Sequence, residues 1–232
     1  DNPELYKFLL DRMAAVLERR AAASAMASSS GLVINTLGWT EGLGYELQLH
    51  AIQVFKADVV VVLEQDRLYS QLSAELKGRP VEVIKLQKSG GVVKRERDER
   101  RLARDMRLRH YFYGPTNNLM PVTQTVRADQ LKVFRIGGGP RAPSSTLPIG
   151  AMASLVDPLR ITHVPFTPEL VQNMLAVSWG ATPEQVLSSN AAGFILVKEV
   201  DTARNTVTFV SPCPGQLPGR YLLAGSLRSA MD

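Results

Sequence analysis

The sequence predicts an α/β fold, in which part of a parallel sheet with crossover helices is followed by a smaller, mixed but mostly β domain. The apolar run at residues 58–63 lacks polar alternation, as strands covered on both faces of a parallel sheet do, and residues 81–86 are expected to form the next strand. Residues 66–76 between them have helical periodicity, and strand–helix–strand order with short links indicates a right-handed parallel unit. The composition then shifts to short β-branched segments. We therefore expect two domains, residues 1–114 and 115–232.

The first segment of the chain is expected to be helical. Asn2 can cap a helix that has Pro3 at its first position and reaches Arg20 or beyond, with apolar residues at helical spacing. A continuous apolar run at 31–35 has the character of a short strand, and residues 45–55 are expected to form a second helix. These elements precede the strand–helix–strand unit and belong to the same predicted domain.

The second half contains three short β-branched runs, 122–126, 131–136 and 161–164. Thr167 and Pro168 match a helix start, which predicts a helix to about Val177. Two further extended runs read as a hairpin and a third as a final strand: 194–200, 207–210 and 221–227. Two proline-rich stretches, 140–148 and 212–218, can be turns or recognition surfaces, and we favour turns.

Composition narrows the class of protein. With 232 residues, 45% of them hydrophobic, the chain can bury a core, and it has no run of 18 apolar residues that would predict a membrane span. The charged, amphipathic start does not resemble a signal peptide. A single cysteine, Cys213, excludes an internal disulfide and fits a reducing compartment. The three histidines lie far apart without metal-ligand spacing, so structural or exposed roles are favoured.

The basic charge is concentrated in one segment, residues 94–109, which has eight basic and four acidic residues and so carries +4 of the chain's net +5. Arginine suits phosphate because its planar fork donates two parallel hydrogen bonds and stays charged. Residues from about 96 to 110 are mostly good helix formers, and on a helix Arg97, Arg101 and Arg104 share a face. The segment is either a solvated helix or a phosphate-binding flap hinged at Gly90 and Gly91.

A loop tryptophan, Trp39, lies in a glycine-rich stretch and can either cover core surface or stack on a nucleobase. Residues 36–39 and 88–91 both follow predicted strands, and ligands of parallel sheets gather beyond the carboxyl ends of strands. We therefore expect the tryptophan and the arginine segment on one rim. Glu64 and Asp66, at a strand-to-helix turn, are either active carboxylates or helix-capping acids.

No GxxxxGK[ST] sequence occurs, and the triple glycine at 137–139 is followed by Pro140 and Arg141 instead of Lys and Ser or Thr. Without that loop the chain offers no cradle for the β- and γ-phosphates and no hydroxyl for Mg²⁺. No Ser/His/Asp or Cys/His group stands at a recognisable spacing either.

Six stretches resemble, in order, the RNA polynucleotide 5′-hydroxyl kinase family of the pre-mRNA cleavage and polyadenylation machinery, and the resemblance covers essentially the whole chain. They are INTLGWTEGLGYELQLHA (34–51), FKADVVVVLEQDRLYSQL (55–72), LQKSGGVVKRERDERRLARDMRLRHYFYG (86–114), LPIGA (147–151), AAGFILVKEV (191–200) and TFVSPCPGQLP (208–218). The resemblance implies the second half of a P-loop (RecA- or Rossmann-like) kinase domain, to about Gly114, and a C-terminal domain. The family's Walker A lysine and Walker B acid have no match here, so the lone chain is expected to be inactive.

The resemblance also implies roles for matching residues. Thr36, Gly38 and Trp39 match the family's clasp for the terminal bases of RNA, with Trp39 stacking. Arg95 and Arg100 match lid arginines that close over the phosphates, and Arg104 falls on a recurrent arginine position. The cofactors implied are ATP and Mg²⁺, bound mainly by the P-loop half of the protein.

Two functions remain open from the sequence. In the first, the intact protein transfers the γ-phosphate of ATP to the 5′-hydroxyl end of RNA. In the second, it is a catalytically silent, ATP-binding scaffold subunit of the 3′-end processing complex. Both imply a nuclear location, and both imply as partners the P-loop part of the same protein and a scaffold subunit of the cleavage factor. A phosphate-binding α/β domain of other ancestry is the third, less favoured reading.

Overall fold

In the computed structural model, residues 2–137 and 157–229 are described, and they divide into two compact units, residues 1–94 and 95–232. Each unit has its own hydrophobic core. Among the described residues, no helix is both long enough and apolar enough to span a membrane.

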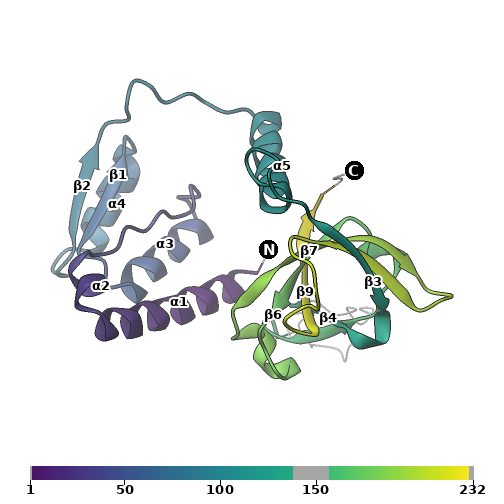
Figure 1. The fold of residues 1–232 in the computed structure, drawn as a ribbon. Helices are drawn as coiled ribbons and strands as arrows, with labels where there is room; N and C mark the ends of the chain where they lie inside the picture. The colour runs from purple at the N-terminus through teal and green to yellow at the C-terminus, as the bar shows by residue number, and fades with distance from the viewer. Residues whose placement is uncertain (1, 138–156, 230–232) are drawn as a thin grey trace, which may run out of the picture. The chain divides into compact units, whose positions relative to one another are not determined.

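The first unit has four helices and a two-stranded parallel sheet (Figure 1). In chain order its elements are α1 (Pro3–Ala23), α2 (Ala25–Ser29), α3 (Leu43–Val54), β1 (Val59–Leu63), α4 (Asp66–Glu75) and β2 (Glu82–Leu86). β1 and β2 pair in parallel, with Val61 opposite Ile84, and α4 is the crossover between them. The predicted strand–helix–strand unit is therefore confirmed.

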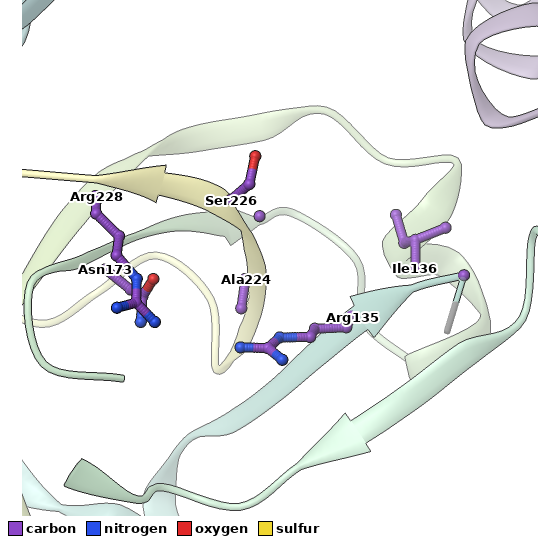
Figure 2. A pocket seen from close by; sticks show the side chains of 8 residues that line it. Arg135, Ile136, Asn173, Ala224, Ser226 and Arg228 are labelled. Carbon is purple, nitrogen blue, oxygen red and sulfur yellow. The ribbon is translucent and has the colours of Figure 1, made fainter. Parts of the chain in front are cut away.

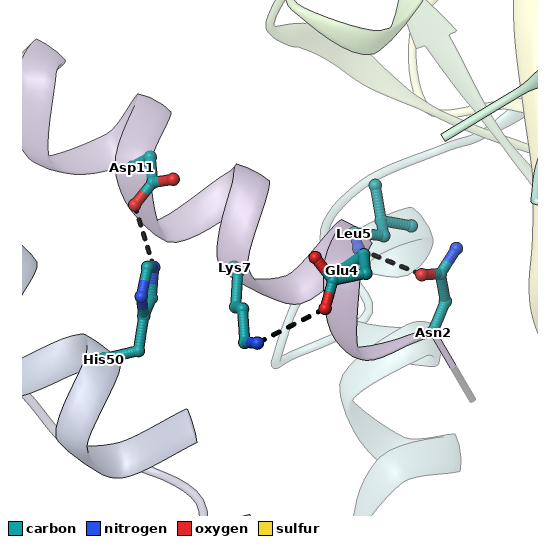
Figure 3. Close-up of polar contacts among 6 residues, drawn as sticks. All are labelled: Asn2, Glu4, Leu5, Lys7, Asp11 and His50. Atoms are coloured by element: carbon teal, nitrogen blue, oxygen red, sulfur yellow. Dashed lines mark hydrogen bonds and ion pairs between the residues drawn. The ribbon is translucent and has the colours of Figure 1, made fainter. Parts of the chain in front are cut away.

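Helix α1 begins where the sequence predicts. Asn2 accepts a hydrogen bond of 3.0 Å from the backbone N–H of Leu5, and proline occupies the first turn. The ring of His50 on α3 lies 2.8 Å from a carboxylate oxygen of Asp11, which ties α3 to α1 (Figure 3). This histidine has the structural role that its sequence context favoured. Among the described residues no group of three His, Cys, Asp or Glu side chains could hold a metal ion.

Two sequence expectations for this unit are wrong. Residues 31–35 form no strand and are exposed, with Val33 97% accessible, because no described strand lies beside them to complete a hydrogen-bond ladder. Strand β1 is not covered on both faces: Val62 packs on α4, whereas Val61 and Leu63 remain about half exposed. The apolar run predicts packing against both faces of the strand, but the described residues of this unit cover only one face.

The second unit is helix α5 (Arg97–Tyr113) and a seven-stranded sheet in the order β3-β8-β7-β6-β9-β4-β5 (Figure 1). Its strands are β3 (Val122–Arg127), β4 (Lys132–Ile136), β5 (Ile161–Val164), β6 (Asn173–Ser178), β7 (Ala191–Asp201), β8 (Thr206–Ser211) and β9 (Tyr221–Arg228). All neighbours pair antiparallel except β4 and β9. The mostly β domain, its β7–β8 hairpin and its final strand are confirmed.

The helix predicted to start at Pro168 and reach Val177 is wrong. Pro168–Leu170 forms only a short 3-10 turn, and β6 follows directly. Five of the six β6 residues are buried, since the strand lies in the middle of the sheet between β7 and β9. Tertiary pairing therefore overrides the local helix-start pattern. The proline-rich stretch at 140–148 lies outside the described residues, and 212–218 forms no regular element.

Helix α5 is anchored at its C-terminal end. Phe112 is fully buried and packs in a cluster with Met174, Leu196 and Val210 of the sheet. The hydroxyl of Tyr111 accepts a hydrogen bond of 2.8 Å from the backbone N–H of Phe194. The arginines before this anchor are exposed, so α5 has one end in the core and the other in solvent.

Candidate phosphate- and base-binding residues

The loop that carries Thr36, Gly38 and Trp39 is held against the first turns of α3. One side-chain amide, Nε2 of Gln48, donates hydrogen bonds to two loop carbonyls, that of Leu37 at 3.1 Å and that of Trp39 at 2.8 Å. These bonds fix the backbone on both sides of Gly38. Trp39 is 51% exposed, so its side chain does not fill the core, and an exposed indole can stack on a base.

Gly44 makes the close approach of the tryptophan possible. A Cβ atom at this position would lie 2.4 Å from Cγ of Trp39 and 2.5 Å from its carbonyl oxygen. Gly44 and Gln48 are one helical turn apart, so a single face of α3 accepts the ring and binds the loop. Neither residue was predicted from the sequence as a support of Trp39. The available signal was their spacing of four, with Gly44 just before the helix predicted over 45–55 and Gln48 within it.

The expected common rim of a parallel sheet is not found as predicted. Residues 88–91 do follow β2, but residues 36–39 follow no strand. Lys88 lies 2.9 Å from Glu64, and Lys85 donates a 2.6 Å hydrogen bond to Asp66, which raises the pKa of Lys85. Both carboxylates thus have ion-pair partners at this end of the strands, and Asp66 also stands in the first turn of α4, the position favoured for capping acids.

The arginine segment is helical from Arg97, as predicted, and a capping interaction begins the helix. Oε2 of Glu99 accepts a hydrogen bond of 2.9 Å from the backbone N–H of Glu96. The guanidinium of Arg100 donates to the carbonyl oxygen of Arg95 at 3.0 Å, which brings these two predicted lid residues together. Arg104 lies one turn further along and lines a different surface, a cavity shared with Arg97 and Arg101.

These residues can perform two kinds of chemistry. An exposed indole on a braced loop can stack on a base, and exposed guanidinium groups can neutralise phosphate oxygens. Thr36, Gly38 and Trp39 belong to the first compact unit, and Arg95, Arg100 and Arg104 belong to the second. Helix α5 therefore belongs to the second unit, and its buried residues pack on the β sheet of that unit.

Comparison with known proteins matches both parts of the chain to one family. Residues 1–114 match the family model "mRNA cleavage and polyadenylation factor CLP1 P-loop", and residues 119–229 match "Pre-mRNA cleavage complex II protein Clp1". The Protein CLP1 homolog of Arabidopsis thaliana is 46% identical over 228 residues, covering 97% of this chain and 51% of the relative. The polyribonucleotide 5′-hydroxyl-kinase Clp1 of Gallus gallus is 41% identical, covering 98% and 53%.

A solved Clp1p chain, from a complex with Pcf11p described for its interface and for ATP loss in a point mutant, has the same fold. Its TM-score is 0.82 at 20% identity, over 99% of this chain and 53% of that one. The chain therefore combines part of a P-loop-type α/β domain with an arginine-bearing helix and a β domain. It belongs to the Clp1 family of mRNA cleavage and polyadenylation factors. It spans about half the length of the relatives that it matches.

Proposed function

We propose that this chain is part of an ATP-dependent RNA 5′-hydroxyl kinase that serves as a subunit of the nuclear mRNA 3′-end cleavage machinery. Relatives at about 41% identity are named polyribonucleotide 5′-hydroxyl kinases. The observation that carries the proposal is the half-exposed Trp39, braced by Gly44 and Gln48. A ring held in this way keeps its stacking geometry without a bound base, so less ordering entropy is lost on binding.

In this proposal Trp39 stacks on the terminal base of the RNA, and Thr36 and Gly38 hold the adjoining backbone. The 5′-hydroxyl oxygen then bonds to the γ-phosphorus of ATP and gives its proton to solvent or to a base of the P-loop half, the bond from the γ-phosphorus to the β–γ bridging oxygen breaks, and ADP leaves. Phosphoryl transfer depends chiefly on positioning and charge neutralisation. Arg95, Arg100 and Arg104 supply positive charge for the migrating phosphoryl group. Their exposed guanidinium groups fit that role, because no acidic side chain described in the structure forms an ion pair with any of them.

ATP and Mg²⁺ are assigned mainly to the P-loop half of the protein. The sequence has no GxxxxGK[ST] loop, and the described residues contain no three-ligand cluster for a metal. We therefore assign no residue of this chain to Mg²⁺. Its contribution to the reaction is acceptor positioning and phosphate neutralisation.

The test is Arg100→Ala in the complete protein, with transfer of ³²P from γ-labelled ATP to a 5′-hydroxyl oligoribonucleotide as the readout. A phosphate-contacting arginine can contribute 10³-fold or more, so we expect turnover to fall by about two decades or more. Arg107→Ala, on the same exposed helix, is the matched control and should retain turnover. Unchanged turnover in Arg100→Ala, at unchanged thermal stability, would refute the assignment.

A second candidate function, a scaffold subunit without catalysis, is favoured by one observation. The solved structures with this fold are complexes of Clp1p with Pcf11p. A pure scaffold would yield no labelled RNA in the same assay, yet would still co-purify with nucleotide and with a cleavage-factor partner. The two functions are compatible, and the transfer assay separates them.

A further inference from the structure

Two cavities in the second unit, which we call the β unit, are both lined by residues near the end of β9. The first, of about 460 Å³, is lined by residues of β4, β6 and β9, including Arg135, Asn173 and Arg228. The second, of about 490 Å³, lies between α5 and β9. Both are lined by Ser226 and Arg228, so they adjoin at this strand. We call the pair the arginine groove.

The lining of the arginine groove is rich in positive charge. Five arginines, Arg97, Arg101, Arg104, Arg135 and Arg228, stand against two aspartates, Asp98 and Asp105, which leaves a net charge of +3. All five are exposed, and none forms an ion pair with an acidic side chain that the structure describes. A concave surface of this kind concentrates anions, and its arginine forks match phosphate oxygens.

The positions of two of these arginines are fixed by the sheet. Arg228 is the register partner of Asn173, and its guanidinium donates to the carbonyl oxygen of Glu169 at 3.4 Å. Asn173 is only 1% exposed and donates to the same carbonyl at 2.9 Å. Figure 2 shows Arg228 beside Asn173, and Arg135 reaching from β4 toward Ala224 of β9. The first cavity therefore holds two guanidinium groups on paired strands.

We propose that the arginine groove, whose lining does not include Trp39, binds the phosphate backbone of single-stranded RNA. The choice of RNA as the polyanion rests on the proposed function. Successive phosphates of one strand can occupy the two adjoining cavities, with Arg228 between them. Among the described lining residues there is no aromatic ring for base stacking, so the groove binds RNA without sequence preference. An acidic peptide is the competing occupant.

The test uses the complete protein and a fluorescent 15-nucleotide oligouridylate that carries a 5′-phosphate. Such an RNA cannot accept a phosphoryl group, so its binding is measured independently of the proposed kinase reaction. A protein without kinase activity can pass this test, and an active kinase can fail it. The affinity is measured from 50 to 300 mM salt for the wild type and for Arg135→Glu/Arg228→Glu.

We expect the double variant to bind this RNA at least about ten-fold more weakly than the wild type. The slope of its log Kd against log salt concentration should be smaller by about 1 to 2. Arg204→Glu, the same charge change on the exposed β7–β8 turn, should bind like the wild type. Arg135→Lys/Arg228→Lys keeps the charge and should retain most of the affinity. Equal weakening by Arg204→Glu, or unchanged RNA affinity in the double variant, overturns the proposal.

Two further measurements keep the proposal falsifiable. If the double variant fails to fold, amide hydrogen exchange of the wild-type protein is measured with and without RNA. We then expect slower exchange of residues 224–228 when RNA is present. Absence of that protection overturns the proposal. Polyglutamate is titrated in parallel, and displacement of the RNA by peptide at lower concentration than by unlabelled RNA would make the groove a peptide site and also overturn it.

Discussion

Gly44 lies directly against the indole of Trp39, so close that a Cβ atom there would stand 2.4 Å from Cγ of the ring. Glycine within a helix ordinarily costs roughly 0.5–1 kcal/mol relative to alanine. In α3 the lower helix propensity of Gly44 leaves room for the half-exposed Trp39 ring to lie on the helix surface. The pair therefore links a local destabilisation of α3 to the candidate base-binding loop.

Replacing Gly44 with alanine should displace the indole. The added methyl group collides with both the ring and the Trp39 carbonyl, so the loop must move. We expect KM for a 5′-hydroxyl RNA to rise in the complete protein, while thermal stability stays near that of the wild type. Tryptophan fluorescence in a Trp179→Phe background reports the displacement directly. Gln53→Ala, an alanine substitution on the exposed face of α3, should change neither measurement.

Removing the ring itself should weaken RNA binding. Stacking of a base on an aromatic side chain contributes about 1–3 kcal/mol, so Trp39→Ala should raise Kd for a short 5′-hydroxyl RNA by about 5- to 150-fold. Trp179→Ala is the matched control, because Trp179 is also exposed, at 60%, and lies in the other unit. Equal losses in both variants would argue against a specific role for Trp39.

The buried ring of Phe112 should dominate the attachment of α5. Phe112→Ala removes a fully buried ring from the cluster with Met174, Leu196 and Val210, and should lower the free energy of unfolding of the β unit by about 3–5 kcal/mol. Leu102→Ala, on the exposed part of the same helix, should stay within about 0.5 kcal/mol. Urea unfolding of both variants checks the difference, and similar values for the two would contradict the anchor.

One acidic group offers a test of the electrostatics. The guanidinium of Arg127, whose Nη2 lies 2.6 Å from the Asp129 carboxylate, lowers the pKa of Asp129 from its ordinary 3.8. The stabilising contribution of a depressed carboxylate is present above its unfolded pKa and is lost as pH falls through its folded pKa. NMR titration should find the Asp129 midpoint below 3.8. In Arg127→Gln it should move up toward the ordinary value, and a midpoint that did not move would exclude Arg127 as the cause.

Periodicity and turn chemistry predicted much of the fold. The α1 cap at Asn2, the parallel β1–α4–β2 unit and the β7–β8 hairpin all follow from local patterns that tertiary structure then satisfies. Residues 31–35 show where that reasoning stops. An apolar run specifies a strand only when a neighbouring strand is present to pair with it, and the described residues place none there.

The candidate site was predictable only in part. Trp39 and the arginine segment stand out by composition, but the supports of the loop, Gly44 and Gln48, depend on which face of α3 meets it. Arg135 and Arg228 were not found at all. They are 93 positions apart and come together only because β4 pairs with β9, a parallel contact that no local pattern specifies.

The anchoring of α5 determines how a packing defect in the β sheet affects the arginines of this helix. Because its buried end packs on the β sheet, the arginines at its exposed end depend on that sheet for their positions. A substitution that disturbs the packing of Phe112 would therefore shift those guanidinium groups without changing any of the arginines themselves.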